Sequence, residues 1–449
     1  MMGEGAQPRW LPASARIWGT LMGCDGAVAT VAGLAGLARL GDGVEIDSGS
    51  GEAVPAEIVA IEGNTVSAML MAPAEGLVAG GRCYLTALER PRPSDGWLGC
   101  VVDAYGRLSD GRPAPQGVDP VSLRRTPPAA AERRGLGARM ATGLAITDTA
   151  LPLCRGQRIG LFAGSGVGKS MLLATLARAV EADVVVVGLI GERGREVGEF
   201  VRDKVGAAGM ARTVVVAASS DQGALVKRRA AFLTLAVAEH FRDHGRHVVC
   251  LFDSVTRFAE AHREIALAAG EAPALRAFPP STAAEIATLC ERAGPGEQAQ
   301  GDITAVFTVL VAGSDMEEPV ADMVRGVLDG HIVLSREIAE RGRFPAIDLR
   351  RSVSRSAPAA WQANEAELAT ELRSLVAAQE EAAPMIQAGL YQPGNDAVLD
   401  RAVKLWPELD RFVGAQSPGA SIEESIEMLE AALKGRARAQ PKLEANKPA

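Results

Sequence analysis

The chain is poor in the features that mark several common protein classes. Its 449 residues include only six cysteines, which lie far apart and form no Cys-x-x-Cys pair. This spacing predicts reduced thiols rather than a disulfide framework or a cysteine-based zinc site. Acidic residues (55) outnumber Lys and Arg (47), so the net charge is −8. General nucleic-acid-binding proteins usually carry a basic excess, and we therefore expect no nucleic-acid partner.

Signals for export or membrane insertion are also missing from the sequence. The first twenty residues lack a basic start followed by an apolar run. The longest apolar segment near the N-terminus, residues 27–38, is too short and too rich in Gly and Ala to span a bilayer. We therefore expect a soluble, cytoplasmic protein whose contact with a membrane is at most peripheral.

The most informative segment that is present is residues 158–170. It reads as an apolar strand, a glycine-rich loop and the start of a helix from Lys169 to about Val180. Glycines let backbone N–H groups close around phosphate oxygens, and the positive end of the helix adds attraction. The pattern predicts a nucleoside-triphosphate cradle in which Lys169 reaches the β- and γ-phosphates and Ser170 holds Mg²⁺. Ala163 departs from the strict pattern, which has glycine there. The cradle residues are Gly164, Ser165, Gly166, Val167, Gly168, Lys169 and Ser170.

Two carboxylates follow apolar strands further along the chain. Asp253 ends the apolar run 247–252, and in a phosphate-loop fold an acid on a second strand stands beside the bound Mg²⁺. Glu192 follows the predicted strand 183–190, where a carboxylate could orient and polarise the attacking water. The adjacent Arg193 could neutralise charge on the γ-phosphate. By spacing alone, the segment 191–197 is explained equally well as a charged surface turn.

Three other side chains each have two interpretations. Arg355 fits a solvated arginine, or a finger inserted into the nucleotide site of a neighbouring subunit. Phe344 fits a buried core ring, or an aromatic that stacks on adenine. Arg257 lies near the predicted phosphate site, or pairs with an acid of the fold.

Periodicity divides the chain into three predicted domains. In residues 1–95, short β-type runs alternate with glycine turns, which predicts a small barrel. In residues 96–355, a proline-rich connector leads into alternating strands and helices, which predicts an α/β, doubly wound and mainly parallel sheet. In residues 356–449, helical patterns replace strands and end in a basic tail that we expect to be disordered. The strands expected in the central domain are 158–162, 183–190, 213–218, 247–252, 303–311 and 331–334.

Five segments (160–170, 188–197, 253–258, 263–267 and 328–336) together resemble the type III protein-export ATPases, most closely the flagellar ones. That family is similar to the catalytic β subunit of rotary ATP synthases. The resemblance is close over about 95–356 and looser over the barrel and the C-terminal helices. Ala163, which breaks the general phosphate-loop pattern, is the residue that this family usually carries.

The resemblance implies a RecA-like P-loop core and Mg²⁺-dependent ATP hydrolysis that energises the unloading or unfolding of export substrates. Phe344 falls where the family places an adenine-stacking aromatic, often Tyr. The resemblance also implies roles for six charged or polar residues. Glu192 matches the catalytic glutamate, Arg193 the adjoining γ-phosphate arginine, and Asp253 the second-strand acid. Lys169 and Ser170 match the residues that bind phosphates and Mg²⁺, and Arg355 matches the finger given to the neighbouring subunit.

The resemblance also implies partners and a location. It implies a homohexamer with active sites between subunits, a dimeric regulator at the N-terminus and a coiled-coil stalk protein in the ring pore. It further implies export-gate membrane proteins, export substrates and chaperones, and a peripheral position at the inner face of the cytoplasmic membrane. Trp10, Leu11, Ile17 and Trp18 either form part of the regulator contact or simply lead into the barrel.

Three alternatives share these core motifs. A subunit of a proton-translocating rotary ATPase would need a non-identical partner in its ring. An RNA-translocating hexameric helicase is disfavoured by the acidic balance and the lack of an aromatic and basic nucleic-acid module. A nucleotide-binding structural subunit that does not hydrolyse ATP is disfavoured by the presence of Glu192, which such subunits often lack.

Overall fold

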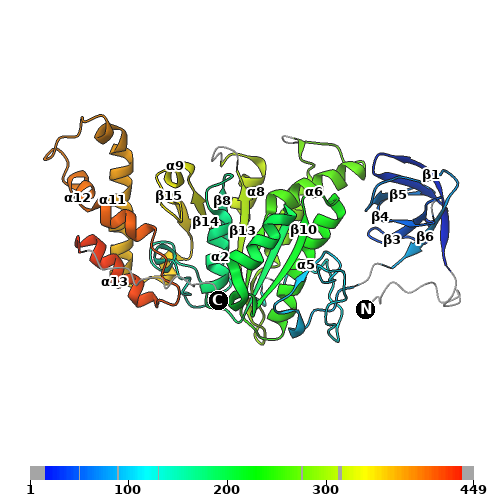
Figure 1. The fold of residues 1–449 in the computed structure, drawn as a ribbon, viewed down its shortest axis with the longest axis horizontal. Coiled ribbons are helices and arrows are strands. Elements are labelled where there is room, and N and C mark those ends of the chain that lie inside the picture. Colours follow the sequence, from blue (N-terminus) through cyan, green and yellow to red (C-terminus); the bar gives the residue numbers. More distant parts are fainter. Residues whose placement is uncertain are drawn as a thin grey trace.

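The computed structural model describes residues 16–49, 51–87, 90–129, 131–274, 277–311 and 316–436. Three bodies lie in a row along the long axis of the molecule (Figure 1). A small barrel forms one end, a sheet covered by helices forms the middle, and a group of helices forms the other end. Among the described residues, no helix combines the length and apolar character needed to cross a bilayer.

The predicted N-terminal barrel is confirmed as a closed six-stranded barrel in the order β1-β2-β5-β4-β3-β6. Alternate side chains point inward, and Leu21, Val31, Ile46 and Ile58 are among those that fill its core. The first strand was not predicted, because two glycines interrupt its apolar pattern. Gly19 is required there, since a Cβ would lie 2.4 Å from the Ala32 carbonyl oxygen. The strands are β1 (Trp18–Asp25), β2 (Val28–Ala32), β3 (Gly43–Asp47), β4 (Ala53–Glu62), β5 (Thr65–Leu70) and β6 (Arg82–Thr86).

The central sheet runs in the order β15-β14-β8-β13-β11-β9-β10-β7, and β12 (Gly294–Pro295) pairs with β13 beside it. The predicted parallel, doubly wound core is confirmed, and all six expected strands occur within two residues of their expected bounds. Strand β15 was missed because it is an edge strand whose exposed positions include Arg350 and Arg351, and it runs antiparallel to β14. The strands are β7 (Val101–Val102), β8 (Arg158–Ala163), β9 (Val184–Glu192), β10 (Thr213–Ser219), β11 (Val248–Asp253), β13 (Asp302–Leu310), β14 (Gly330–Leu334) and β15 (Ile347–Ser354).

Each face of this sheet has its own hydrophobic core, because successive strand residues point to opposite sides. Val185 and Val187 of β9 face a core that includes the helix after the phosphate loop and the C-terminal helices. Val184 and Val186 face a second core under the other helices. The first face carries α2 (Lys169–Ala179), and the second carries α5 (Ala224–Asp243), α6 (Val255–Ala268), α7 (Ser281–Glu291) and α8 (Pro319–Val327).

Short helical segments that the sequence pattern did not reveal complete this domain. Most are too short to show a full period of apolar residues. They are α1 (Ala145–Asp148), α3 (Gly194–Glu199), a π-helical turn (Phe200–Val205), α4 (Gly206–Met210) and α9 (Arg336–Glu340).

The C-terminal region is helical, as predicted. It contains α10 (Ala357–Ala360), α11 (Ala363–Gln387), α12 (Ala397–Val413) and α13 (Ile422–Leu433). Helix α11 runs eight residues past the expected end at 379, through Pro384 in its final turns. Leu372, Leu409 and Leu429 join these helices to the core on the α2 face of the sheet. The domain boundaries at residues 95 and 355 stay predictions.

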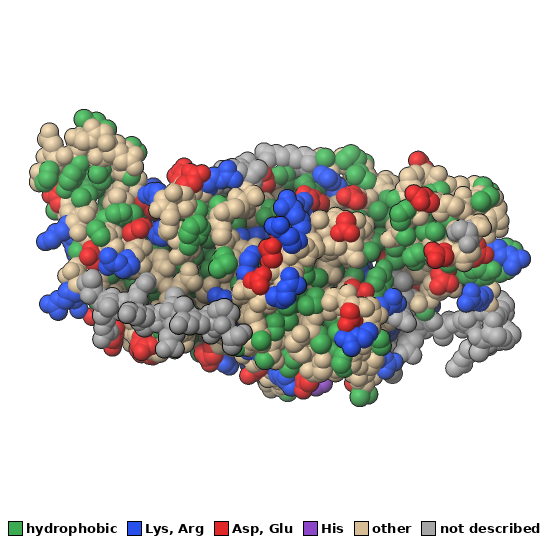
Figure 2. Space-filling model, in the orientation of Figure 1, with side chains coloured by type: hydrophobic (Ala, Val, Ile, Leu, Met, Phe, Trp, Pro, Cys, Tyr) green, Lys and Arg blue, Asp and Glu red, His purple; other side chains and the backbone are tan. Residues whose placement is uncertain are grey.

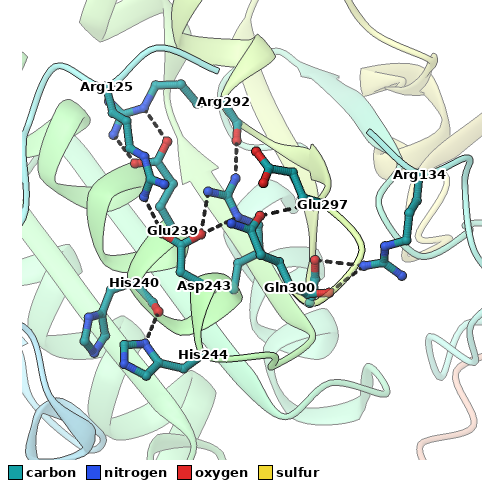
Figure 3. Close-up of polar contacts among 11 residues, drawn as sticks. Arg125, Arg134, Glu239, His240, Asp243, His244, Arg292, Glu297 and Gln300 are labelled. Atoms are coloured by element: carbon teal, nitrogen blue, oxygen red, sulfur yellow. Dashed lines mark hydrogen bonds and ion pairs between the residues drawn. The ribbon is translucent and has the colours of Figure 1, made fainter. Parts of the chain in front are cut away.

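The proline-rich connector is anchored to the base of the sheet domain by arginines (Figure 3). Arg125 of the connector pairs with Asp243 at the end of α5. Arg292 forms a two-pronged ion pair with Glu239, at 2.8 and 2.7 Å, and also donates to the Leu123 carbonyl at 2.8 Å. Both charged side chains of that pair are buried, with 1% and 2% exposed. The connector is therefore fixed in place although it contains little regular structure.

Candidate active site

The candidate site lies at the carboxyl ends of four neighbouring parallel strands. Strands β8, β13, β11 and β9 are adjacent in that order. The phosphate loop follows β8, Asp253 ends β11 and Glu192 ends β9. In open α/β sheets the crevice outside these strand ends is the usual ligand site. The topology therefore brings together Lys169 of the loop, Glu192 and Asp253, although Lys169 and Asp253 lie 84 positions apart in the chain.

The phosphate loop has the backbone that its glycines predict. Gly166 and Gly168 have φ of +80° and +92°, in the left-handed region that disfavours residues with a Cβ. A Cβ on Gly168 would also lie 3.1 Å from the Phe344 ring. Among the described non-glycine residues only Ala277 has a positive φ, so Ala163 keeps ordinary strand geometry. The departure from the strict pattern at Ala163 is therefore harmless.

Lys169 stands between the two predicted carboxylates. Its Nζ donates to Glu192 Oε1 at 3.2 Å and to Asp253 Oδ1. Asp253 Oδ1 also accepts from the Thr308 hydroxyl at 2.7 Å. Thr308 follows directly after the last pair of residues joined across β11 and β13, which places it beside Asp253. Sequence reasoning missed Thr308, because a threonine inside an apolar strand gives no signal until the neighbouring strand is known.

Burial and charge shape the ionisation of this cluster. Burial raises the pKa of Asp253 above its usual range, although the Lys169 ammonium opposes that shift. Burial alone would lower the pKa of Lys169, but the carboxylates of Asp253 and Glu192 raise it above its ordinary value. Lys169 is therefore a cation at neutral pH, which is the form that attracts phosphate.

A β-bulge positions Glu192. Strand β10 pairs Ala218 with Ile190 and then Ser219 with Glu192, so Gly191 is left out of the register. Gly191 has a φ of +76°, and a Cβ there would lie 3.1 Å from Arg257. Bulges change the direction of the side chains that follow them. The glycine thus allows the strand to end with a carboxylate directed at Lys169.

The predicted arginines near Glu192 do not join the cluster. The side chain of Arg193 is 81% exposed and donates to Glu196 at 3.1 Å. Arg257 pairs with Glu260 at 2.8 Å, which matches its alternative interpretation as a partner of an acid in the fold.

Phe344 lies beside the phosphate loop, although it is far from it in sequence. Its ring is half-exposed and faces the Cα of Gly168. Arg336, which sequence reasoning did not select, donates to the carbonyl of Ser165 in the loop at 3.3 Å. The buried-core interpretation of Phe344 is therefore wrong, and an exposed ring is available at the edge of the site.

Arg355 lies away from the cluster. Strand β15 is antiparallel to β14, and Ser354 pairs with Gly330 at the amino end of β14. Strand β14 is parallel to β8, so Arg355 lies at the amino ends of these strands, whereas the phosphate loop lies at their carboxyl ends. Its side chain is exposed, and its backbone N–H donates to the Asp329 carbonyl at 2.9 Å.

The residues considered for a regulator contact are only partly described. Trp10 and Leu11 lie outside the described residues. Ile17 packs against the barrel core, whereas the Trp18 side chain is exposed at the start of β1 with Arg82 over its ring.

Comparison with known proteins places this geometry in a family. Residues 143–354 match the nucleotide-binding domain of the ATP synthase alpha/beta family, and residues 361–431 match the EscN-type C-terminal domain of type III secretion ATPases. A flagellum-specific ATP synthase of Caulobacter vibrioides is 44% identical over 423 residues, which cover 92% of this chain and 95% of that protein.

Two solved structures agree with this match. The assembled ATPase EscN from the type III secretion system of enteropathogenic E. coli has a TM-score of 0.82 and 35% identity, covering 92% of this chain and 100% of that chain. EscN in complex with its central stalk EscO has a TM-score of 0.82 and 36% identity, with the same coverage.

Proposed function

This chain belongs to the flagellar and type III secretion ATPases of the ATP synthase alpha/beta family, and we propose that it uses Mg²⁺·ATP hydrolysis to unload or unfold proteins for a flagellar export apparatus. One observation carries the catalytic part of this proposal. Lys169 contacts both Glu192 and Asp253 beside a phosphate loop, at the carboxyl ends of parallel strands. The match of residues 361–431 to the secretion-type C-terminal domain favours export over proton translocation.

The chain's own residues fit a nucleotide with a magnesium ion. No group of three or more His, Cys, Asp or Glu side chains suited to a metal occurs in the described part of the chain. Mg²⁺ in such enzymes is held by one or two protein oxygens together with substrate phosphates, so a full protein cage is not needed. Ser170 and Asp253 are the oxygen ligands that we propose. When bound, the ion neutralises charge on the phosphate oxygens.

The remaining groups divide the chemistry among them. The loop amides and Lys169 hold the β- and γ-phosphates, and Phe344 stacks on the base. Glu192 orients and polarises the attacking water, as a carboxylate at hydrogen-bonding distance does. Arg193 turns from its exposed position to meet the γ-phosphate. These assignments are supported by the clustering of Lys169, Glu192 and Asp253 and by the position of the Phe344 ring beside Gly168 of the loop.

The proposed assembly is a homohexamer in which Arg355 completes the site of the neighbouring subunit. Its exposure at the edge opposite its own phosphate loop supports an action between subunits. The likeness to assembled EscN supports self-association, and the likeness to EscN with EscO supports a central stalk partner. We extend the proposal to an N-terminal regulator, export-gate membrane proteins, chaperones with their substrates, and a cytoplasmic position at the membrane face.

Replacing Glu192 tests the catalytic proposal. Glu192→Gln keeps the shape of the side chain and removes the charge that polarises water, so ATP turnover should fall about a hundredfold or more while nucleotide binding persists. Glu199→Gln is a matched control, because Glu199 pairs with Arg195 one turn earlier on the same helix, α3, and not with Lys169. Phosphate release and the binding of a fluorescent nucleotide are the two measurements. Near-normal turnover in Glu192→Gln would refute the assignment.

A further inference from the structure

The carboxyl end of α5 carries two histidines that are four residues apart. His240 lies in the last turn of the helix, and His244 caps it. Residues with this spacing share one face of a helix. The two imidazole rings lie beside each other (Figure 3), with their centroids 4.5 Å apart and their planes inclined by 49°. Because α5 leads into β11, which begins at Val248, the pair lies near the amino end of that strand and away from the Lys169 cluster.

A hydrogen bond decides which nitrogen of His244 is available. Its Nδ1 lies 2.7 Å from the backbone carbonyl oxygen of His240. A carbonyl oxygen can only accept, so Nδ1 carries the proton and Nε2 of the neutral ring keeps its lone pair. Histidines that bind metals usually donate their other ring N–H to a carbonyl or carboxylate in this way. In the surface view, histidine reaches the solvent at the lower edge of the sheet domain (Figure 2), and His244 is exposed.

The ring of His240 is held in place without the use of its nitrogens. It makes a T-shaped contact with the ring of Phe241, at 5.2 Å between the centroids, and Phe241 is buried. Within the described part of the chain, no hydrogen bond or ion pair involves a ring nitrogen of His240. Both histidines therefore offer a free nitrogen on rings whose positions are already restricted.

The arginines near this pair already have anionic partners. Asp243 accepts from Arg242 at 3.0 and 2.8 Å and also pairs with Arg125 of the connector. Arg246 follows the histidines and pairs with Asp95 at 2.7 Å. These paired arginines oppose a cation bound to the histidines less than unpaired arginines would.

Two neighbouring imidazoles select for a divalent transition-metal ion. Imidazole suits Zn²⁺, Ni²⁺ and Cu²⁺, whereas Mg²⁺ and Ca²⁺ take oxygen ligands. With Zn–N bonds of about 2.0–2.1 Å, two nitrogens on one ion lie about 3 Å apart, and histidines four residues apart on a helix meet that requirement in zinc motifs. No cluster of three or more His, Cys, Asp or Glu side chains occurs among the residues that the structure describes, so water would fill the other positions.

We propose that His240 and His244 form a chelating site for a divalent transition-metal ion, with water completing its coordination. The site is separate from the Mg²⁺ site proposed for catalysis, which uses oxygen ligands at the carboxyl ends of the strands. Both ligands belong to one helical turn, so the ion binds them together only when that turn is folded. Binding therefore stabilises the end of α5, where Asp243 anchors the connector through Arg125.

Calorimetric titration of the full, untagged chain with ZnCl₂ tests the proposal. The titration is carried out at about pH 8, where imidazole is mostly neutral, and in excess Mg²⁺, which occupies oxygen sites. A Cys24→Ser parent chain removes the exposed thiol. This parent should bind Zn²⁺, and His240→Asn or His244→Asn should each weaken that binding about tenfold or more, because chelation needs both nitrogens. His244 is exposed, so the fold should survive its replacement.

His331→Asn is the matched control. His331 lies in β14, is partly exposed, and has its Nε2 2.9 Å from the Arg351 carbonyl oxygen. This change should leave zinc binding unaltered. Electron paramagnetic resonance of bound Cu²⁺ should show two nitrogen ligands in the parent and one in either single variant. Unchanged zinc affinity in His240→Asn with His244→Asn would overturn the proposal, as would equal weakening by His331→Asn. Displacement of Zn²⁺ by Mg²⁺ would assign the ion to the nucleotide site instead.

Discussion

At the scale of single residues, Asp253 depends on its neighbour Thr308. Both of the contacts that hold this carboxylate, from Lys169 Nζ and from the Thr308 hydroxyl, are made to Oδ1. When Lys169 turns to phosphate, the Thr308 hydroxyl is the donor that remains on that oxygen. Thr308 is fully buried, so its hydroxyl has no access to solvent as an alternative partner. The threonine therefore acts as a positioning residue for the proposed metal ligand.

Thr308→Val should weaken the binding of Mg²⁺ at the nucleotide site. The valine has the same shape but cannot donate to Asp253, and a lost hydrogen bond to a buried charged group costs about 1.5–3 kcal/mol. We expect the Mg²⁺ concentration for half-maximal turnover to rise about tenfold, and Mg²⁺ to strengthen nucleotide binding less than in the wild type. Thr308→Ser restores the hydroxyl and should recover both measurements. Failure of the serine variant to recover them would indicate a packing role instead.

The left-handed glycines of the phosphate loop provide a second test at this scale. Gly168→Ala adds backbone strain, about 1–2 kcal/mol, and places a Cβ 3.1 Å from the Phe344 ring. Gly166→Ala adds similar strain but meets nothing within 4 Å. Urea unfolding should therefore show a larger loss of stability for Gly168→Ala than for Gly166→Ala. If Phe344→Ala is added, the two losses should become equal, and a difference that persisted would contradict the contact.

At the scale of elements, the pair Arg292–Glu239 joins α5 to the end of α7 and to the connector. Arg292→Met leaves Glu239 as a buried unpaired carboxylate, so unfolding free energy should fall by about 3–5 kcal/mol. The double change Arg292→Met with Glu239→Leu removes both charges and should recover most of that loss. Arg246→Ala breaks the largely exposed pair with Asp95 and should cost less than about 1 kcal/mol. If urea unfolding showed the same loss of unfolding free energy in Arg292→Met and Arg246→Ala, burial of the ion pair would not determine the cost of breaking it.

Two buried histidines make the packing of these elements depend on pH. His247 is bonded to Thr304 in β13, and His262 of α6 is bonded to Ser281 at the start of α7. Burial lowers the pKa of each below its ordinary value of 6.5, and nearby arginines add to that shift. The fold thus favours the neutral rings. The stability that the neutral rings contribute is fully present above pH 6.5, which is the pKa of the unfolded histidine. It is lost as the pH falls below that value.

The expected result is a smaller pH effect in a variant without these rings. Unfolding free energy should fall between about pH 7.5 and about pH 5.5 in the wild type, and less in His247→Asn with His262→Asn. Urea unfolding at constant protein concentration, repeated across this pH range, gives the unfolding free energy of the wild type and of the variant. The same pH slope in the wild type and the variant would show that other groups are responsible.

At the scale of the whole molecule, the position of Arg355 predicts that mutants repair one another. On its own, each of Glu192→Gln and Arg355→Ala should reduce turnover about a hundredfold or more. In a ring assembled from equal amounts of both, about a quarter of the interfaces should combine an intact Glu192 with an intact Arg355 from its neighbour. Turnover of the mixed ring should then recover to about a quarter of the wild-type turnover. A mixed ring with no activity, confirmed as mixed by mass spectrometry, would show that Arg355 does not act across the interface.

The local sequence was sufficient for the features that have a clear short-range pattern, although it missed β1, β15 and the short helices. The phosphate loop, its helix, the six predicted strands of the central sheet and the acids at the ends of two of them follow from short patterns, because glycine conformation and apolar periodicity are local properties. Tertiary structure alone decided which side chains meet. The contact of Thr308 with Asp253 and the position of Phe344 beside Gly168 depend on strand order and on the packing around the central sheet. Such contacts join residues far apart in the chain, so no sequence window contains both partners.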